Sequence, residues 1–336
     1  MTSDRKGAPT PKGHGMSLRE IEFESFNKRD TVHAWRYAPV TEPVAVVQLI
    51  HGLGEHSRRY LHLISSLVAN GIVVVANDHV GHGKTGMESG IWQDTGDTGW
   101  ETYVEDEYSL TQIAKEEYPD LPYFIFGHSW GSMIGRAYMT RHGEELDGLM
   151  LCGVVEQWLG ADQIDRQALQ AEIDAGRGAE PAPDALLGQL FAGATDRFGD
   201  DPHPNDWIAA FRPIVDDHAV DPFNNFNAHM TTRFLKDFVD INDVATAPDI
   251  AEHFPLDLPV LLLAGDQDPV GNYGEGVYHA ANKLWKRGLR DVRTVVYSGL
   301  RHEVHNEPES RDEVEAEILV FVFLNSQVAA DDDLVE

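Results

Sequence analysis

The stretch FGHSWGS, Phe126–Ser132, places a serine between two glycines directly after an apolar run, Tyr123–Phe126. Such a run predicts a buried strand, and the residues after it predict a helix. A sharp turn between the two favours glycine at Gly127 and Gly131, because a side chain there would collide as helix and strand close on one another. The turn would lift the hydroxyl of Ser129 above the carboxyl edge of a sheet, facing the N–H groups of the new helix. In this context G-x-S-x-G predicts a nucleophilic serine rather than a helix cap.

Short apolar runs alternate with longer amphipathic stretches through most of the chain. The expected strands are Val44–Ile50, Ile72–Ala76, Tyr123–Phe126, Leu149–Cys152, Val260–Ala264 and Val292–Val296. The expected helices are Tyr60–Asn70, Trp100–Glu117, Met133–His142, Val277–Lys286 and Glu313–Asn325. Ahead of them, Glu20–Asn27 and Thr31–Tyr37 are typical of an antiparallel hairpin. This alternation predicts an α/β protein with a mostly parallel, doubly wound sheet of about eight strands.

The alternation stops between residues 155 and 254, where prolines and aromatic residues interrupt helix-like stretches. We interpret this region as a helical cap inserted into a core made of residues 19–154 and 255–326. Residues 1–18 are expected to be a flexible tail and residues 327–336 an acidic tail. The cap aromatics, which look exposed, are Trp158, Phe191, Trp207, Phe211, Phe223, Phe226, Phe234 and Phe238.

The chain of 336 residues carries a formal net charge of −30, from 56 acidic and 26 basic residues. Such a charge repels phosphate backbones and argues against nucleic-acid binding, although an apolar patch on the cap leaves a transient membrane contact possible. One cysteine, Cys152, excludes a disulfide framework. The N-terminus lacks a signal-peptide pattern, and no apolar stretch is long enough to cross a membrane, so a cytoplasmic location is expected.

A serine hydroxyl needs a base to remove its proton, and in this fold type the order is serine, acid, histidine. The loop GDQDPV after Val260–Ala264 offers Asp266 and Asp268 as the acid. We favour Asp268, because the proline that follows restricts its backbone to extended geometry. The loop YSGLRHEVHNE offers His302 and His305 as the base. We favour His302, which is nearer the strand end, and assign His305 a supporting role.

The oxyanion formed by attack on an acyl group needs two hydrogen-bond donors. One is expected to be the backbone N–H of Trp130, directly after the serine. The other is expected from the loop HGLGEH, where Gly52 and Gly54 allow the backbone to present the N–H of Leu53.

Taken together, HGLGEHSRRY, NDHVGHGKT, GHSWGS, LLLAGDQDPV and RHEVHNE resemble the monoacylglycerol lipase and lysophospholipase-like branch of the α/β-hydrolase fold. The resemblance covers residues 18–326 and is weakest in the cap. It implies a serine hydrolase in which Ser129, Asp268 and His302 form the catalytic triad, with Leu53 and Trp130 at the oxyanion hole. Trp130 stands where small or flexible residues such as methionine are usual, and its indole is expected to narrow the acyl pocket.

The resemblance also implies an acyl channel through the cap, for which Trp158, Phe191 and Phe211 are candidates; an ordinary cap core explains these residues equally well. The predicted function is hydrolysis of a monoacyl lipid or other small carboxylic ester without cofactor or metal. A proline-iminopeptidase type of peptidase, a short-chain carboxylesterase and a binding module with an inactive triad are the alternatives. The histidines of the glycine-rich loops do not have metal-site spacing, and the sequence does not define the oligomeric state.

Overall fold

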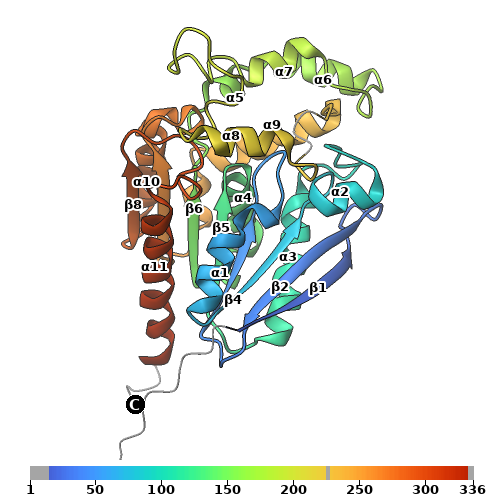
Figure 1. The fold of residues 1–336 in the computed structure, drawn as a ribbon. Helices are drawn as coiled ribbons and strands as arrows, with labels where there is room; N and C mark the ends of the chain where they lie inside the picture. The colour runs from blue at the N-terminus through green and yellow to red at the C-terminus, as the bar shows by residue number, and fades with distance from the viewer. Residues whose placement is uncertain (1–14, 225–227, 332–336) are drawn as a thin grey trace, which may run out of the picture.

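One eight-stranded sheet forms the centre of the computed structural model, which describes residues 15–224 and 228–331 (Figure 1). The strands are β1 (Met16–Glu24), β2 (Thr31–Pro39), β3 (Ala45–Ile50), β4 (Ile72–Asp78), β5 (Tyr123–His128), β6 (Gly148–Cys152), β7 (Val260–Gly265) and β8 (Val292–Tyr297). Their spatial order is β1-β2-β4-β3-β5-β6-β7-β8. The pairs β1–β2 and β2–β4 are antiparallel and the others are parallel. The predicted fold class is therefore confirmed.

Burial explains which strands the sequence marks clearly. Strands β3 to β7 are buried at every position, so they read as continuous apolar runs. Strand β1 lies at the edge of the sheet and is mostly exposed, and its pairing with β2 continues to Met16 opposite Pro39. It therefore begins before the predicted Glu20, inside the stretch expected to be a tail. Residues 1–14 of that tail lie outside the described residues.

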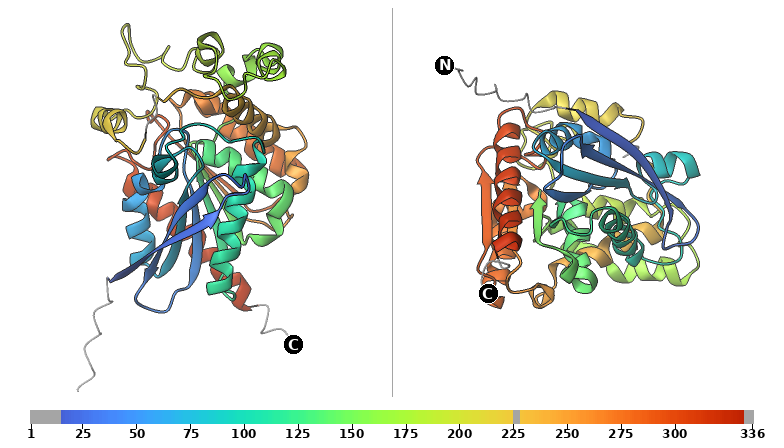
Figure 2. Two further views of the ribbon diagram at one scale, coloured as in Figure 1. Left: turned by 90° about the vertical axis from the view of Figure 1, so that its right-hand side faces the viewer. Right: turned by 90° about the horizontal axis from the view of Figure 1, so that it is seen from below.

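Helices cover both faces of the sheet (Figures 1 and 2). They are α1 (Leu61–Ala69), α2 (Gly83–Ser89), α3 (Glu101–Glu117), α4 (Trp130–His142), α10 (Glu275–Arg287) and α11 (Arg311–Asp331). Alternate residues of β3 divide between two apolar cores, with Val46 and Ile50 in one and Val47 and Leu49 in the other. The first core contains side chains of α3, α4 and α10, and the second contains side chains of α1 and α11. This arrangement is the physical reason for the two-sided burial of the strands.

Between β6 and β7 the chain leaves the sheet and lies over its upper end (Figures 1 and 2). We call residues 153–259 the covering segment. Its α-helices are α5 (Leu159–Gln163), α6 (Arg166–Asp174), α7 (Asp184–Leu190), α8 (Arg212–Val220) and α9 (Thr232–Thr246). Residues 191–211 form turns and bends without a helix. Arg233 of α9 attaches the segment to the core through ion pairs with Asp94 and Asp97.

The aromatic residues of this segment are less exposed than their sequence suggests. Phe234 and Phe238 of α9 are buried, as are Trp158 and Trp207, because they pack on the core below. Phe211 is exposed, and Phe226 lies outside the described residues.

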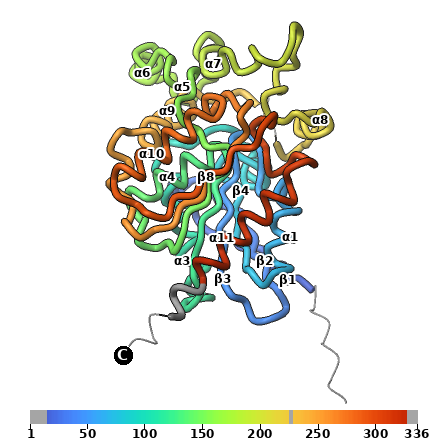
Figure 3. The backbone as a smooth tube through the Cα atoms, turned by 90° about the vertical axis from the view of Figure 1, so that its left-hand side faces the viewer, coloured from blue at the N-terminus to red at the C-terminus, as the bar shows by residue number. Residues whose placement is uncertain are grey.

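The start of β1 and the end of α11 lie at the end of the molecule opposite the covering segment (Figures 1 and 3). Helix α11 continues to Asp331, into the stretch expected to be an acidic tail, and residues 332–336 lie outside the described residues. Among residues 15–224 and 228–331, no helix has both the length and the apolar character needed to cross a membrane.

A buried carboxylate on α9 predicts a pH-dependent stability. Burial raises the pKa of Asp237 to about 7, against the effect of a hydrogen bond from Thr95. The folded state therefore holds this proton more tightly than the unfolded chain, so stability falls as pH rises from the ordinary aspartate pKa toward 7. In urea unfolding, Asp237→Asn is expected to gain about 3 kcal/mol of stability relative to the parent as pH rises from 4 to 7, because the parent aspartate must ionise in a buried place. A difference that does not change with pH would contradict this assignment.

Candidate active site

Ser129 lies in the sharp turn between β5 and α4 with a backbone φ of 56° and ψ of −119°. A positive φ is uncommon for a residue with a side chain, and it needs support from its surroundings. The Ser129 N–H donates to the carbonyl of Cys152 at 2.9 Å. A Cβ at Gly127 would collide with the carbonyl of Gly131, and a Cβ at Gly131 would collide with the carbonyl of Ile50. Both glycines are therefore required by close backbone approach, as the sequence predicted.

Two further loops bring an acid and an imidazole to the same rim of the sheet. Asp268 follows β7 and is fully buried, and His302 lies between β8 and α11. The Nδ1 atom of His302 is 2.8 Å from Oδ2 of Asp268. The other carboxylate oxygen of Asp268 accepts a hydrogen bond from the backbone N–H of Val270 at 3.0 Å. The carboxylate thus has a fixed orientation toward the ring.

The competing acid and histidine have other contacts. Asp266 accepts the backbone N–H of Gly299 at 2.7 Å and so stabilises the turn after β8. His305 is buried and stacks on Tyr60, with ring centroids 4.9 Å apart. The geometry therefore favours Asp268 and His302, and it leaves His305 a packing role.

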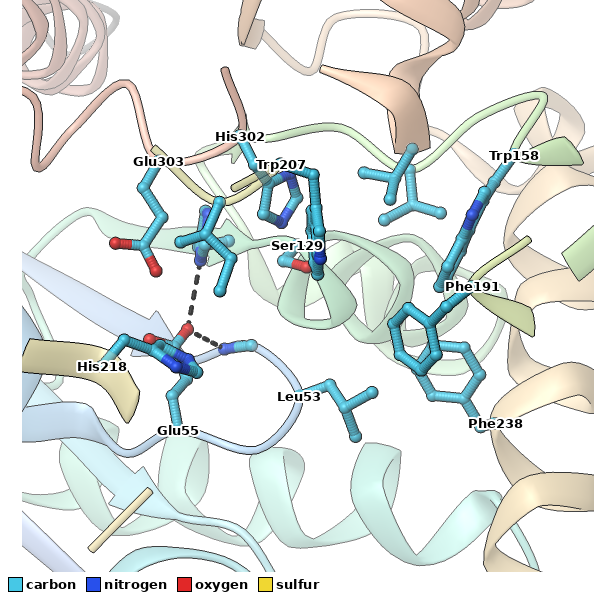
Figure 4. Close-up of a pocket in the computed structure, with 15 residues that line it drawn as sticks. Leu53, Glu55, Ser129, Trp158, Phe191, Trp207, His218, Phe238, His302 and Glu303 are labelled. Atoms are coloured by element: carbon cyan, nitrogen blue, oxygen red, sulfur yellow. Dashed lines mark hydrogen bonds and ion pairs between the residues drawn. The ribbon is translucent and has the colours of Figure 1, made fainter. Parts of the chain in front are cut away.

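Ser129 and His302 line one cavity and lie beside each other in it (Figure 4). The Nε2 atom of His302 is buried and has no hydrogen-bond partner among the described residues. An imidazole whose Nδ1–H is held by a carboxylate presents Nε2 as the proton acceptor. The arrangement is therefore suited to accept a proton from a hydroxyl on the Ser129 side of the ring.

Electrostatics adjust the basicity of this ring. Burial alone would lower the pKa of His302, but the charge and hydrogen bond of Asp268, with the charges of Glu303 and Glu55, outweigh burial and raise it. The ring of His128, with its centroid 4.9 Å from that of His302, also faces it. His302 is thus a stronger base than an ordinary histidine.

The predicted oxyanion donors lie on two sides of the serine. Trp130 is the first residue of α4, so its N–H has no acceptor within the helix. Leu53 lines the cavity from the loop after β3, in which Gly54 has a φ of 66°. The N–H of Gly52, one residue earlier, donates to Oε1 of Glu55 at 2.6 Å and fixes this loop.

The cavity is polar at one end and apolar at the other. Glu55, His218 and Glu303 lie on one side of Ser129 (Figure 4). The opposite side presents the apolar side chains Trp158, Phe191 and Phe238 (Figure 4). The site therefore has separate surroundings for a polar and an apolar part of one ligand.

Two sequence expectations about the cavity do not match this geometry. Phe211 is 47% exposed and is not among the residues that line the cavity. The indole of Trp130 is buried between Tyr103, Phe234 and Phe238 and does not line the cavity either. Its size is accommodated by the aromatic core below α9, so it does not narrow the cavity directly.

Sequence reasoning gave no site role to Trp207 or to the Glu55–Arg59–Glu303 ion cluster. Trp207 covers His302, with ring centroids 5.0 Å apart. The acidic residues were present in the motifs HGLGEH and RHEVHNE, and the glutamate next to the histidine in the second motif was the available signal. Their partners come from distant parts of the chain, so local patterns did not reveal the cluster.

Comparison with known proteins places the chain in a family. The family model described as "Serine aminopeptidase, S33" (Hydrolase_4) matches residues 41–309. The chain belongs to this family. A monoacylglycerol lipase of Mycolicibacterium smegmatis is 29% identical over 281 residues, covering 82% of this chain and 87% of that protein. The predicted assignment to the monoacylglycerol lipase-like branch of the α/β-hydrolases is confirmed.

Two solved structures are similar over nearly the whole chain. One is described as a lipase in its open form, with a TM-score of 0.89, 49% identity and coverage of 92% of this chain and 99% of that one. The other is a thermostable carboxyl esterase of Bacillus coagulans in complex with glycerol, with a TM-score of 0.89, 47% identity and coverage of 93% and 100%.

The two aspartates of the β7 loop provide a matched test of the acid. Asp268→Asn should lower kcat for an activated ester by about 10³-fold or more, because the amide no longer holds the imidazole in the required form. Asp266→Asn, two residues earlier, should leave kcat within about twofold. Steady-state kinetics of the folded variants measure both values. Near-normal turnover of the Asp268 variant would assign the acid to another residue.

The raised pKa of His302 predicts the pH dependence of the reaction. His302 must be neutral to accept a proton, so kcat/KM should rise with pH through an apparent pKa above the ordinary histidine value of 6.5. The residual activity of Asp268→Asn should show a lower apparent pKa, because the largest charge that stabilises the imidazolium is gone. An unchanged apparent pKa in this variant would contradict the electrostatic role of Asp268.

Proposed function

We propose that this protein is a serine-dependent carboxylic ester hydrolase that acts on monoacylglycerol-like esters through an acyl-enzyme. The observation that carries the proposal is the 2.8 Å contact between His302 and Asp268 beside the strained turn of Ser129, in one cavity. The lipase and esterase names of the relatives support the same reaction class.

The mechanism follows from these positions. The Ser129 oxygen attacks the ester carbonyl while its proton passes to Nε2 of His302, and Asp268 stabilises the imidazolium. The N–H groups of Leu53 and Trp130 bind the oxyanion. Collapse of the tetrahedral intermediate breaks the bond to the alcohol, which leaves with the proton from His302. Water, deprotonated by His302, then attacks the acyl-enzyme and releases the carboxylic acid and Ser129.

The two ends of the cavity indicate how a substrate would lie. We assign the apolar side, with Trp158 and Phe191, to the acyl chain, since contact with aromatic side chains removes apolar surface from water. The polar side, with Glu303 and His218, then faces the alcohol. The covering segment, with residues 155–254 as its main part, acts as the cap that separates these surroundings from solvent.

The peptidase alternative, which the family description raises, needs a carboxylate free to bind a substrate ammonium group. Glu55 and Glu303 line the cavity, but both are paired with Arg59 at 2.6 Å. Glu303 also accepts a hydrogen bond from Asn306 at 2.7 Å. These carboxylates are engaged already, so the geometry favours an ester over an aminoacyl substrate.

The proposal is tested with p-nitrophenyl esters from acetyl to palmitoyl, 1-monoacylglycerols and aminoacyl anilides. We expect ester hydrolysis, cleavage of monoacylglycerols and little cleavage of anilides. A fluorophosphonate probe should label the parent protein at Ser129 and leave Ser129→Ala unlabelled. Failure on monoacylglycerols with rapid cleavage of short esters would leave an esterase without lipid preference. Absence of both labelling and turnover would indicate a binding protein.

A further inference from the structure

The side chain that follows the predicted base is directed away from it, into a second contact. Glu303 is 2% exposed, and its two carboxylate oxygens accept hydrogen bonds from both terminal nitrogens of Arg59, at 2.6 and 2.9 Å. Asn306 donates to the same carboxylate. Since Glu303 and His302 are neighbours in the chain, fixing one side chain restricts the backbone that carries the other.

Arg59 connects this contact to the loop on the other side of the serine. Its Nη1 atom also donates to Oε2 of Glu55 at 2.6 Å. The second oxygen of Glu55 accepts the backbone N–H of Gly52 at 2.6 Å, next to the predicted oxyanion donor Leu53. One guanidinium therefore joins the loop of the base to the oxyanion loop, two segments that are far apart in the sequence.

We call Glu303, Arg59 and Glu55 the bridge, and its three side chains remain charged at neutral pH. Burial alone would raise the pKa of Glu303, but the charge and hydrogen bonds of Arg59 outweigh burial and lower it. Burial alone would also raise the pKa of Glu55, and hydrogen bonding to His128 with the charge of Arg59 reverses this effect. The charges of the two glutamates in turn raise the pKa of Arg59, although burial opposes protonation. The bridge is thus a buried, ionised carboxylate–guanidinium–carboxylate unit.

A buried ion cluster adds little stability compared with apolar packing, because desolvation offsets the attraction between its charges. A bidentate guanidinium–carboxylate pair does impose a defined distance and orientation on the groups it joins. The covering segment adds to this restraint, since Ile208 accepts the backbone N–H of Glu303 at 2.8 Å. The bridge therefore fixes the distance and orientation of the loops it joins and adds little to stability.

We propose that Glu303 is a positioning residue that, through Arg59 and Glu55, sets the placement of His302 relative to the oxyanion donors. This inference rests on the proposed function, since it concerns the same serine chemistry. Glu303 lines the polar end of the cavity, but Arg59 and Asn306 engage both of its carboxylate oxygens, so it acts on the reacting atoms through the placement of His302. Its loss should reduce transition-state stabilisation more than substrate binding, because the base and the donors must both meet the acyl carbon in one geometry.

The test uses Glu303→Gln, with the exposed Glu309→Gln of the same loop as its matched control. The amide has the shape of the carboxylate but lacks the charge that binds Arg59. We expect kcat to fall at least about tenfold with KM changed less than about threefold, and labelling of Ser129 by the fluorophosphonate to slow in parallel. The control should keep the parent values. Thermal unfolding of each variant measures its folded fraction.

Arg59→Lys provides the second variant, because an ammonium group keeps the charge but lacks the planar fork that bridges two carboxylates. It should show a similar loss in kcat. The kcat of the double variant should be no lower than that of the less active single variant, as expected for groups that act as one unit. If Glu303→Gln does not fold, Arg59→Lys decides by the same criteria.

Parent-like kcat and labelling in a folded Glu303→Gln would overturn the inference. A fall in kcat that is fully explained by the fraction of unfolded variant would overturn it as well. Either result leaves the proposed function intact as long as the parent is labelled at Ser129. A parent that is neither labelled nor active would instead contradict the proposed function itself.

Discussion

The close approach of three backbone segments at Ser129 is the constraint on which the site depends. Strand β5 can turn into α4 only because Gly127 and Gly131 leave room for carbonyl groups, one of them from Ile50 at the end of β3. The same approach holds Ser129 at a φ of 56° and places the first N–H of α4 next to its side chain. Strand β5, helix α4 and the end of β3, from which the oxyanion loop begins, therefore pack against one another at this one place. The strain at the serine is balanced by the packing of the whole sheet edge.

This constraint is local in sequence, which explains why it could be predicted. The glycines on either side of the serine, the apolar run before them and the proline after Asp268 are all readable within a few residues. The strands β3 to β7 were equally clear, because burial on both faces leaves continuous apolar runs. The edge strand β1 was less clear, since its exposed residues have no strong pattern.

What the sequence did not reveal depends on contacts between distant residues. The indole of Trp130 was expected at the cavity, yet it fills a space made by Tyr103 of α3 and Phe234 of α9. Phe211 was a candidate for the acyl channel, but its side chain is 47% exposed and does not line the cavity. Aromatic composition identifies a region that packs against something, but it does not say which aromatic faces the ligand. Only the tertiary arrangement separates Phe191 from Phe211.

The covering segment and the loop that carries His302 restrain each other. The backbone N–H groups of His302 and Glu303 donate to the carbonyls of Trp207 and Ile208, at 3.4 and 2.8 Å, and the indole of Trp207 lies against the imidazole. The residues that close the cavity from above therefore also restrain the loop that carries the base. It follows that the shape of the cavity and the placement of His302 are coupled. A change in residues 207–208 that enlarges the cavity also removes support from the base, so the two properties do not vary independently.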